Sequence, residues 1–257
     1  MKNIKVPILM YHDIDVKDPK SVYSISISRF REHMNWLYEK GYGTIALNDL
    51  TLCARNNGKM PKKPLIITFD DGYAACYKLA YPILKEYGFT ASFFITTNWI
   101  GKGGYMDWEH IKAMKKGGME IGSHGHSHVP LSDLDRHIIK YELENSKLLI
   151  EEYLRDAVGF FSVPGGYFND SIKQIAKEVG YKGVLTSQFG TNDKQTDLYE
   201  LRRIGVRGYY TPQYLEKLMN DRINLNYRVD YFLRSVLKKS LGDRGYRWFL
   251  KHCFGSA

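Results

Sequence analysis

The 257-residue sequence contains few cysteines and no long apolar segment. Its three cysteines, Cys53, Cys76 and Cys253, are far apart, and the sequence has no Cys-x-x-Cys pair. They support neither a disulfide framework nor a thiolate zinc site, and they are typical of a protein from a reducing compartment. Internal repeats and low-complexity linkers are also missing, which argues against a repeat architecture.

No segment of the sequence resembles a signal peptide or a membrane span. The apolar stretch 6–11 is six residues long, is followed by His12 and Asp13, and lacks a small-residue cleavage site. No other apolar run approaches the length that crosses a bilayer. We therefore expect a cytoplasmic protein, unless the sequence begins after a signal that has been removed.

Acidic residues are scarce toward the C-terminus. Residues 201–257 contain twelve Lys and Arg against four Asp and Glu, and they carry most of the formal net charge of +9. This asymmetry favours an anionic membrane surface, a phosphate or a nucleic acid as a partner, but a solvated basic surface explains it equally well. Because no nucleic-acid-binding motif is recognisable, we expect no nucleic-acid partner. Thr211 and Pro212 are a typical N-cap and first helical position, so 211–257 is expected to be a basic helical extension, packed on the preceding domain or lying on a membrane.

Short apolar runs alternate with helical stretches from residue 7 to about residue 183. "PILMYH" (7–12), for example, precedes a helical stretch in which Ser28 is the expected N-cap and Gly41 the stop. Strands that alternate with helices indicate βαβ units and a parallel sheet. Six or more such rounds favour a closed barrel over an open sheet, and we expect this α/β domain to cover residues 1–210.

The most apolar of these runs, "LIITF" (65–69), ends in two adjacent carboxylates, Asp70 and Asp71. Functional groups of parallel α/β folds gather at the carboxyl ends of the strands. One aspartate would serve as the N-cap of the next helix, but a cap does not explain two. Gly72 predicts a tight turn that lets a ligand approach.

A second strand edge follows "MEIG" and contains His124, His126 and His128 within five residues. Neutral imidazoles four residues apart can face one ion if the segment forms a helical turn. Two imidazoles and a carboxylate are a common open metal site, which leaves positions for water and substrate. One aspartate would complete that site while its neighbour takes a proton from water.

A third strand edge follows "VGFFS" and reads Pro164, Gly165 and Gly166. The glycines leave backbone N–H groups accessible, as an oxyanion site requires, although a simple turn between a strand and a helix uses the same residues. Taken alone, this motif does not distinguish an oxyanion site from a simple turn.

Together these residues resemble the polysaccharide deacetylase family, the NodB-like carbohydrate esterases. "TFDDG" (68–72) and the His-x-x-x-His within "EIGSHGHSH" (120–128) match the first two motifs of that family, and "FFSVPGGYFN" (160–169) resembles the third. The resemblance covers roughly residues 5–207. It implies a distorted (β/α) barrel of about seven strands.

The resemblance also implies a role for each matching residue. Asp70 would be the general base, and Asp71 would bind a divalent metal together with His124 and His128. The metal is usually Zn²⁺ in this family, with Co²⁺, Ni²⁺ or Mn²⁺ as alternatives. The backbone N–H of Gly165 would help to hold the oxyanion that forms when water attacks an amide carbonyl.

The sequence departs from the common family pattern in two ways. The usual late Leu-x-His motif is missing, but "ILMYHDI" (8–14) looks like the opening strand of circularly permuted relatives. We therefore expect His12 to be the general acid, the alternative being a buried histidine at a strand end.

The second departure is at Ser162, where many relatives carry an arginine that pairs with the base. "ELRRIGV" (200–206) resembles a segment of the permuted relatives. It predicts that Arg203 supplies this guanidinium and keeps Asp70 ionised, with Arg202 as the alternative.

These features predict a hydrolase of carbon–nitrogen bonds other than peptide bonds. It would deacetylate N-acetylated sugars in a polysaccharide, an oligosaccharide or a lipid-linked glycan, the last at the inner membrane face. Trp108 and Tyr167 are candidate stacking surfaces for sugar rings, although aromatic residues at these positions are also ordinary packing. The alternatives are a carbohydrate-binding barrel without activity, and a sugar O-esterase or deformylase with the same site.

Overall fold

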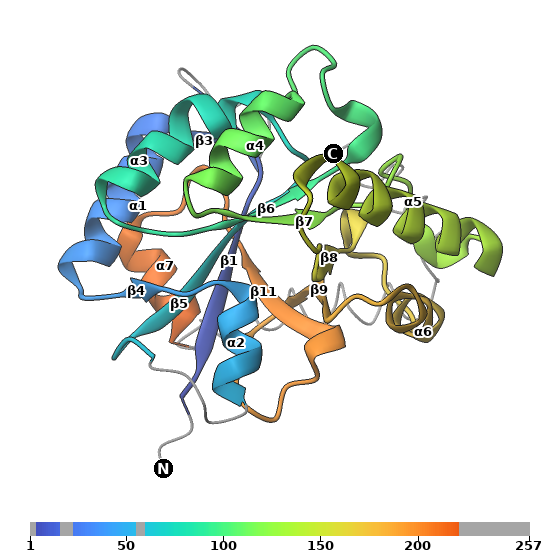
Figure 1. Cartoon of the computed structure of the whole chain (residues 1–257). Helices are drawn as coiled ribbons and strands as arrows, with labels where there is room; N and C mark the ends of the chain where they lie inside the picture. The colour runs from blue at the N-terminus through green and yellow to red at the C-terminus, as the bar shows by residue number, and fades with distance from the viewer. Residues whose placement is uncertain (1–3, 16–22, 55–59, 221–257) are drawn as a thin grey trace, which may run out of the picture.

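The computed structural model describes residues 4–15, 23–54 and 60–220, and it shows a closed barrel of seven parallel strands (Figure 1). The strands are β1 (Val6–Tyr11), β5 (Pro64–Phe69), β6 (Ser92–Ile95), β7 (Glu120–Ser123), β8 (Phe160–Ser162), β9 (Gly183–Phe189) and β11 (Leu201–Gly205). They follow one another in the order β1, β11, β9, β8, β7, β6, β5, and the pairing of β1 with β5 closes the ring. The expected (β/α) barrel of about seven strands is confirmed.

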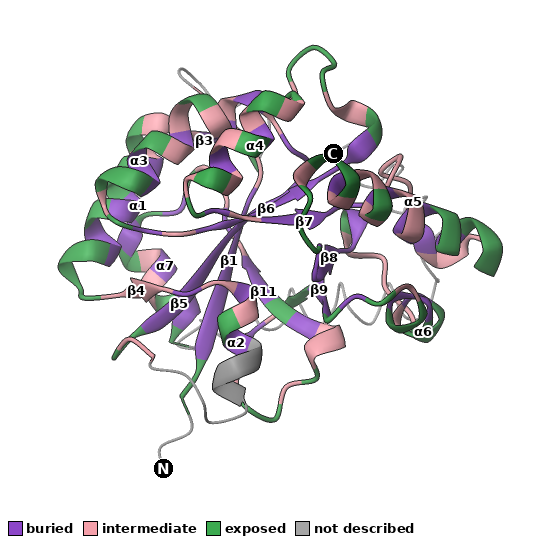
Figure 2. Cartoon of the chain, in the orientation of Figure 1, coloured by how far each residue is buried: buried purple, intermediate pink, exposed green. Residues whose placement is uncertain are grey.

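Helices cover the outside of the barrel, with buried residues on the side toward the strands and exposed residues on the outer side (Figure 2). They are α1 (Ile27–Glu39), α2 (Leu47–Ala54), α3 (Tyr81–Glu86), α4 (Trp108–Lys116), α5 (Arg136–Leu154), α6 (Asp170–Val179) and α7 (Pro212–Met219), with a short π-helix (Cys76–Ala80) ahead of α3. The short strands are β2 (Ile14–Asp15), β3 (Ile25–Ser26), β4 (Gly43–Thr44) and β10 (Thr191–Asn192). Apolar residues at helical spacing explain the packing: α6 buries Ile172, Ile175 and Ala176.

Alternate residues of the strands belong to two separate apolar clusters, as the period of a β-strand requires. One cluster combines Ile8, Ile66, Phe94 and Phe160, on four different strands, with Leu47 of α2. The other joins the remaining strand residues to the helices. The first cluster fills the barrel, and α2 closes its amino-terminal end. The carboxyl ends of the strands are left as the open end, where the predicted functional residues lie.

Two predictions about helix starts have different outcomes. Helix α1 begins after Ser26, whose Oγ accepts a hydrogen bond from the backbone N–H of Arg29 at 3.3 Å, so the predicted N-cap at Ser28 is wrong by two residues. Thr211 caps α7 as predicted, through a bond from the backbone N–H of Tyr214 at 3.2 Å.

The C-terminal extension is described only as far as residue 220. Within that part, α7 packs beside α1 and buries Leu215, Leu218 and Met219. Residues 221–257, which hold most of the predicted basic extension, lie outside the described residues, and a domain division at residue 210 stays a prediction. Among the described helices, none has the length and apolar character needed to cross a membrane.

Candidate active site

Asp70 and Asp71 lie where β5 ends, at the open mouth of the barrel. The backbone N–H of Asp70 donates to Tyr11 O at 3.0 Å, which continues the pairing of β5 with β1 by one residue. Asp71 then adopts a left-handed backbone with φ 75°, and Gly72 follows with φ 89°. These two consecutive left-handed residues reverse the chain, so the two carboxylates leave the strand in different directions. Positive φ is uncommon outside glycine and is tolerated best by Asp and Asn.

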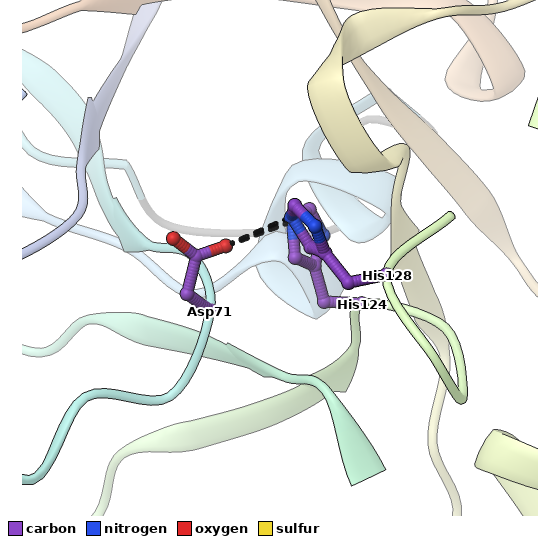
Figure 3. Close-up of side chains that lie close together, drawn as sticks. All are labelled: Asp71, His124 and His128. Carbon is purple, nitrogen blue, oxygen red and sulfur yellow. Dashed lines mark ion pairs between the residues drawn. The ribbon is translucent and has the colours of Figure 1, made fainter. Parts of the chain in front are cut away.

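His124 and His128 face Asp71 from the segment after β7 (Figure 3). The Nε2 atoms of His124 and His128 lie 3.3 and 3.2 Å from Asp71 Oδ1. His124 is buried, and its Nδ1–H donates to Ser162 O at 2.8 Å, which leaves Nε2 directed at Asp71. His126 is not part of this group, because its Nδ1 lies 2.9 Å from Thr97 Oγ1.

The three ligand atoms fit a divalent metal ion. They lie within 4.8 Å of one another. Asp71 Oδ1 is buried, yet it accepts no properly oriented hydrogen bond from any residue in the described part of the chain. Buried polar atoms are normally satisfied, so an unpaired oxygen that converges with two imidazole nitrogens belongs to a group that could hold an ion. Two imidazoles and one carboxylate form the open donor set typical of catalytic zinc.

The electrostatics of these ligands suit a cation. Burial opposes ionisation of Asp71, but the two imidazoles outweigh it and hold the pKa of that carboxyl below its ordinary value. Burial likewise opposes protonation of His124, and the carboxylates of Asp70 and Asp71 outweigh it and raise the pKa of the imidazole. The site therefore holds an ionised carboxylate in a buried setting, where a bound cation would be screened little by solvent.

Asp70 belongs to a separate buried network. Arg203 Nη1 donates to Asp70 Oδ1 at 2.8 Å, and the Ser162 hydroxyl donates to Asp70 Oδ2 at 3.0 Å. The guanidinium also donates from Nη2 to Ser162 Oγ at 2.9 Å and from Nε to Thr186 O at 2.9 Å. Arg202 is exposed, so of the two predicted arginines it is Arg203 that contacts the carboxylate. Burial would raise the pKa of Asp70, but Arg203, together with His124 and His12, outweighs it and leaves the pKa below its ordinary value.

His12 follows β1 and stands beside the aspartates, because β1 pairs in parallel with β5. Its ring packs 5.1 Å from the ring of Tyr23, between centroids. Its Nδ1 is buried and has no hydrogen-bond partner among the described residues. Burial lowers the pKa of His12, and Asp70 and Asp71 offset this only in part.

The remaining predicted residues are not all brought to the same place. Gly165 lies in a short turn (Pro164–Gly166) with φ 61°, and a Cβ there would stand 2.8 Å from the ring of Tyr167. Gly165 is exposed and Tyr167 half-buried at the end of β8. Trp108 instead stacks on Tyr153 of α5, with centroids 3.9 Å apart and rings nearly parallel.

Three aromatic rings that the sequence motifs do not single out lie in a row beside His128. Trp99 packs 4.7 Å from His128, Tyr105 packs 4.7 Å from Trp99, and Tyr73 stacks 5.1 Å from Tyr105, all between centroids. The signal for Trp99 and Tyr73 was their position a few residues beyond the ends of β6 and β5. These rings form a row that starts at a predicted metal ligand.

Comparison with known proteins places this geometry in a family. The polysaccharide deacetylase model matches residues 57–184. YxkH of Bacillus subtilis strain 168, named as a polysaccharide deacetylase, is 32% identical over 221 residues, which are 84% of this chain and 78% of YxkH. The chain belongs to the polysaccharide deacetylase family. As a member of that family it is a hydrolase of carbon–nitrogen bonds other than peptide bonds.

Two further proteins that are similar to this chain are also named as deacetylases. The poly-β-1,6-N-acetyl-D-glucosamine N-deacetylase of Staphylococcus aureus strain MRSA252 is 30% identical over 193 residues, which cover 69% of this chain and 66% of the relative. The structure of the deacetylase PplD from Streptococcus pyogenes, in complex with acetate, superposes with a TM-score of 0.80 at 28% identity. The match covers 85% of this chain and 99% of PplD.

Proposed function

We propose that this family member is a metal-dependent N-deacetylase that hydrolyses the acetamido group of N-acetylated glycans. The observation that carries the proposal is the convergence of Asp71, His124 and His128 on one point, beside a carboxylate held by Arg203. In the proposal, Asp71, His124 and His128 hold the cation, with Zn²⁺ favoured by the donors and Co²⁺, Ni²⁺ or Mn²⁺ as alternatives. When bound, the cation would act as a Lewis acid toward the acetamido carbonyl and lower the pKa of a neighbouring water.

Asp70 is proposed as the general base. It is ionised because Arg203 and Ser162 supply hydrogen bonds that favour the charged form, and an ionised carboxylate can accept the proton of an attacking water. The same two bonds fix the direction of the carboxylate. Arg203 therefore acts through Asp70 rather than on the substrate.

His12 is proposed as the general acid that protonates the departing amine. Since its pKa is lowered by burial, the imidazole is neutral at the start, and it must gain a proton during turnover. The reaction supplies one: the attacking water loses a proton to Asp70, that proton passes from Asp70 to His12, and His12 gives it to the leaving nitrogen. His12 and Asp70 lie at the ends of neighbouring strands, which suits them to these two transfers.

The glycan is proposed to contain N-acetylglucosamine. The Staphylococcus aureus relative is named for a polymer of this sugar, and PplD was solved with acetate, the acid that deacetylation releases. The row formed by Trp99, Tyr105 and Tyr73 offers aromatic faces for pyranose rings next to His128, while Tyr167 and the backbone N–H of Gly165 are proposed to contact the acetamido group. Trp108, stacked on Tyr153, is a weaker candidate than these three rings.

The test measures acetate release from N-acetylglucosamine oligomers by protein stripped of metal and then reloaded with Zn²⁺. The proposal predicts one acetate per deacetylated residue, restored by metal, and loss of turnover in Asp70→Asn with zinc binding retained. Tight oligomer binding without acetate release would favour a carbohydrate-binding barrel. Faster release from O-acetyl or formyl sugars would favour the esterase or deformylase alternative.

A cytoplasmic location at the inner membrane face, with a lipid-linked substrate, is proposed from the basic C-terminal segment alone. That segment lies mostly outside the described residues. Sedimentation with anionic vesicles at low salt tests it, and a full-length protein that stays in the supernatant would contradict it.

A further inference from the structure

Glu142 is a buried carboxylate that the proposed chemistry does not use. It lies on α5 with 4% of its surface exposed. Its Oε2 accepts the backbone N–H of His126 at 2.9 Å and of Ser127 at 2.8 Å, and its Oε1 accepts the hydroxyl of Ser127. A carboxylate offers enough acceptor sites for three donors at one place, and these bonds offset the cost of burying its charge.

The two residues that Glu142 binds, His126 and Ser127, directly precede His128 in the sequence. The rings of the two proposed ligands, His124 and His128, differ in the hydrogen bonds that orient them. The ring of His124 is fixed by its own bond to Ser162 O. For the His128 ring, the described residues provide no comparable hydrogen bond; it contacts Asp71 and the ring of Trp99. Its backbone is left-handed with φ 57°, a conformation that persists only when the surroundings impose it. The position of His128 therefore depends on its backbone.

A second contact from α5 supports the same segment. Ser146, one turn beyond Glu142, lies with its Oγ 2.7 Å from Ser123 Oγ, and Ser123 Oγ accepts the backbone N–H of Gly125 at 3.1 Å. Gly125 has a left-handed backbone with φ 81°, a conformation that residues with a side chain rarely adopt. Helix α5 thus contacts the segment on both sides of His126, through Ser123 before it and Ser127 after it.

We propose that Glu142 is a positioning residue that places His128 as the third metal ligand by holding the backbone of His126 and Ser127. The proposal rests on the metal site of the proposed function. Partners of this kind, one step removed from the ligands, commonly contribute 10–100-fold to metal affinity. Without the carboxylate, the two N–H groups would lose their acceptor and the left-handed His128 would lose what imposes its conformation.

The experiment compares three variants with the wild-type protein. Glu142→Ala removes all the acceptors. Glu142→Gln keeps an amide oxygen for the two N–H groups, while the Ser127 hydroxyl can turn to accept from its NH₂. Leu143→Ala, at a fully buried neighbour on the same helix, weakens α5 without removing a side-chain hydrogen bond to the segment. Zinc affinity is measured by competition with a chelator, and hydrogen exchange at the amides of His126 and Ser127 is followed in the metal-free protein.

We expect Glu142→Ala to bind zinc about 10–100-fold more weakly and to lose protection at both amides, and Glu142→Gln to stay within about threefold of the wild type. Leu143→Ala should melt roughly 5–10 °C lower and keep its zinc affinity. Equal zinc affinity in Glu142→Ala and the wild type, or an equal loss in Leu143→Ala, would overturn the inference alone. A wild-type protein that binds no zinc would overturn the proposed function and this inference together.

Discussion

Glu120 at the closed end of the barrel and Asp71 at the open end differ in how fully their oxygens are hydrogen-bonded. At the closed end, Glu120 begins β7 and accepts four hydrogen bonds: from the backbone N–H groups of Leu47 and Asn48, from the Asn48 side chain and from the Ser92 hydroxyl. At the open end, Asp71 Oδ1 is buried and no described residue donates a well-oriented bond to it. The carboxylate of Glu120 thus holds the start of α2 through its hydrogen bonds, whereas the Oδ1 atom of Asp71 has no donor among the described residues.

Two buried histidines also differ in how fully they are hydrogen-bonded. His33, buried on α1, uses both ring nitrogens: Tyr11 OH donates to Nδ1 at 3.1 Å, and Nε2–H donates to Tyr210 O at 2.8 Å. His12, at the mouth, leaves a buried Nδ1 without a described partner. Folding normally satisfies buried polar groups, so groups left open at one end mark where a ligand completes the structure.

The largest effect is expected from Asp71→Asn. The change keeps size and tolerance of a positive φ, but it removes the charge that holds the cation. Acetate release should fall by about 10³-fold or more, since the several kcal/mol contributed by a Lewis acid would be lost. Zinc binding should fall with it, while the melting temperature changes little. Turnover close to that of the wild type, measured with the same oligomers, would contradict the site.

Arg203→Met should have the next largest effect. It leaves Asp70 buried without the guanidinium that contributes most to lowering its pKa, so the pKa of the carboxyl rises. Because the base works only when ionised, the acidic limb of the kcat/KM profile should move to higher pH, and the rate at neutral pH should drop about 10²-fold. Arg203→Lys, which keeps the charge but not the fork of donors, should lie between the two. An unmoved acidic limb in the methionine variant would remove Arg203 from the proposal.

Much of this contrast could be predicted from the sequence, because motifs at strand ends are local. "TFDDG" and the His-x-x-x-His placed Asp71, His124 and His128 together, since parallel strands bring their carboxyl ends to one edge. The Ser162 hydroxyl on Asp70 joins residues 92 positions apart, and no local pattern records it.

The local errors have similar causes. The N-cap of α1 was misplaced because Ile25 and Ser26 pair with β2, a contact that only the folded chain makes. Trp108 follows the N-cap Asp107 and so begins α4 on the side that faces α5, which no pattern in "DW" could show. Helix periodicity predicts which residues are buried, but it does not predict the neighbour they face.

Glu120→Gln tests the closed end with the same carboxylate-to-amide change. One of its two acceptor oxygens becomes a donor that faces other donors, so we expect a loss of about 1–3 kcal/mol in the free energy of unfolding. In contrast to Asp71→Asn, kcat and KM should stay within about twofold of the wild type, because the site lies at the other end. Urea unfolding and acetate release at a temperature where both proteins are folded measure the two effects. A kcat loss comparable to that of Asp71→Asn would contradict the assignment of a purely structural role to Glu120.

The smallest effect concerns His33, the satisfied histidine. Burial lowers its pKa from the ordinary 6.5 to about 4. Below pH 6.5 the unfolded chain takes up a proton that the folded chain still refuses, so stability falls as the pH drops toward 4. This one group should account for about 2 kcal/mol of lost stability at pH 5 relative to pH 7.5. Urea unfolding at these two pH values should show a smaller difference in His33→Gln, whose amide can donate to Tyr210 O and accept from Tyr11. If the pH dependence is the same in both proteins, His33 is not the buried neutral group that its two hydrogen bonds indicate.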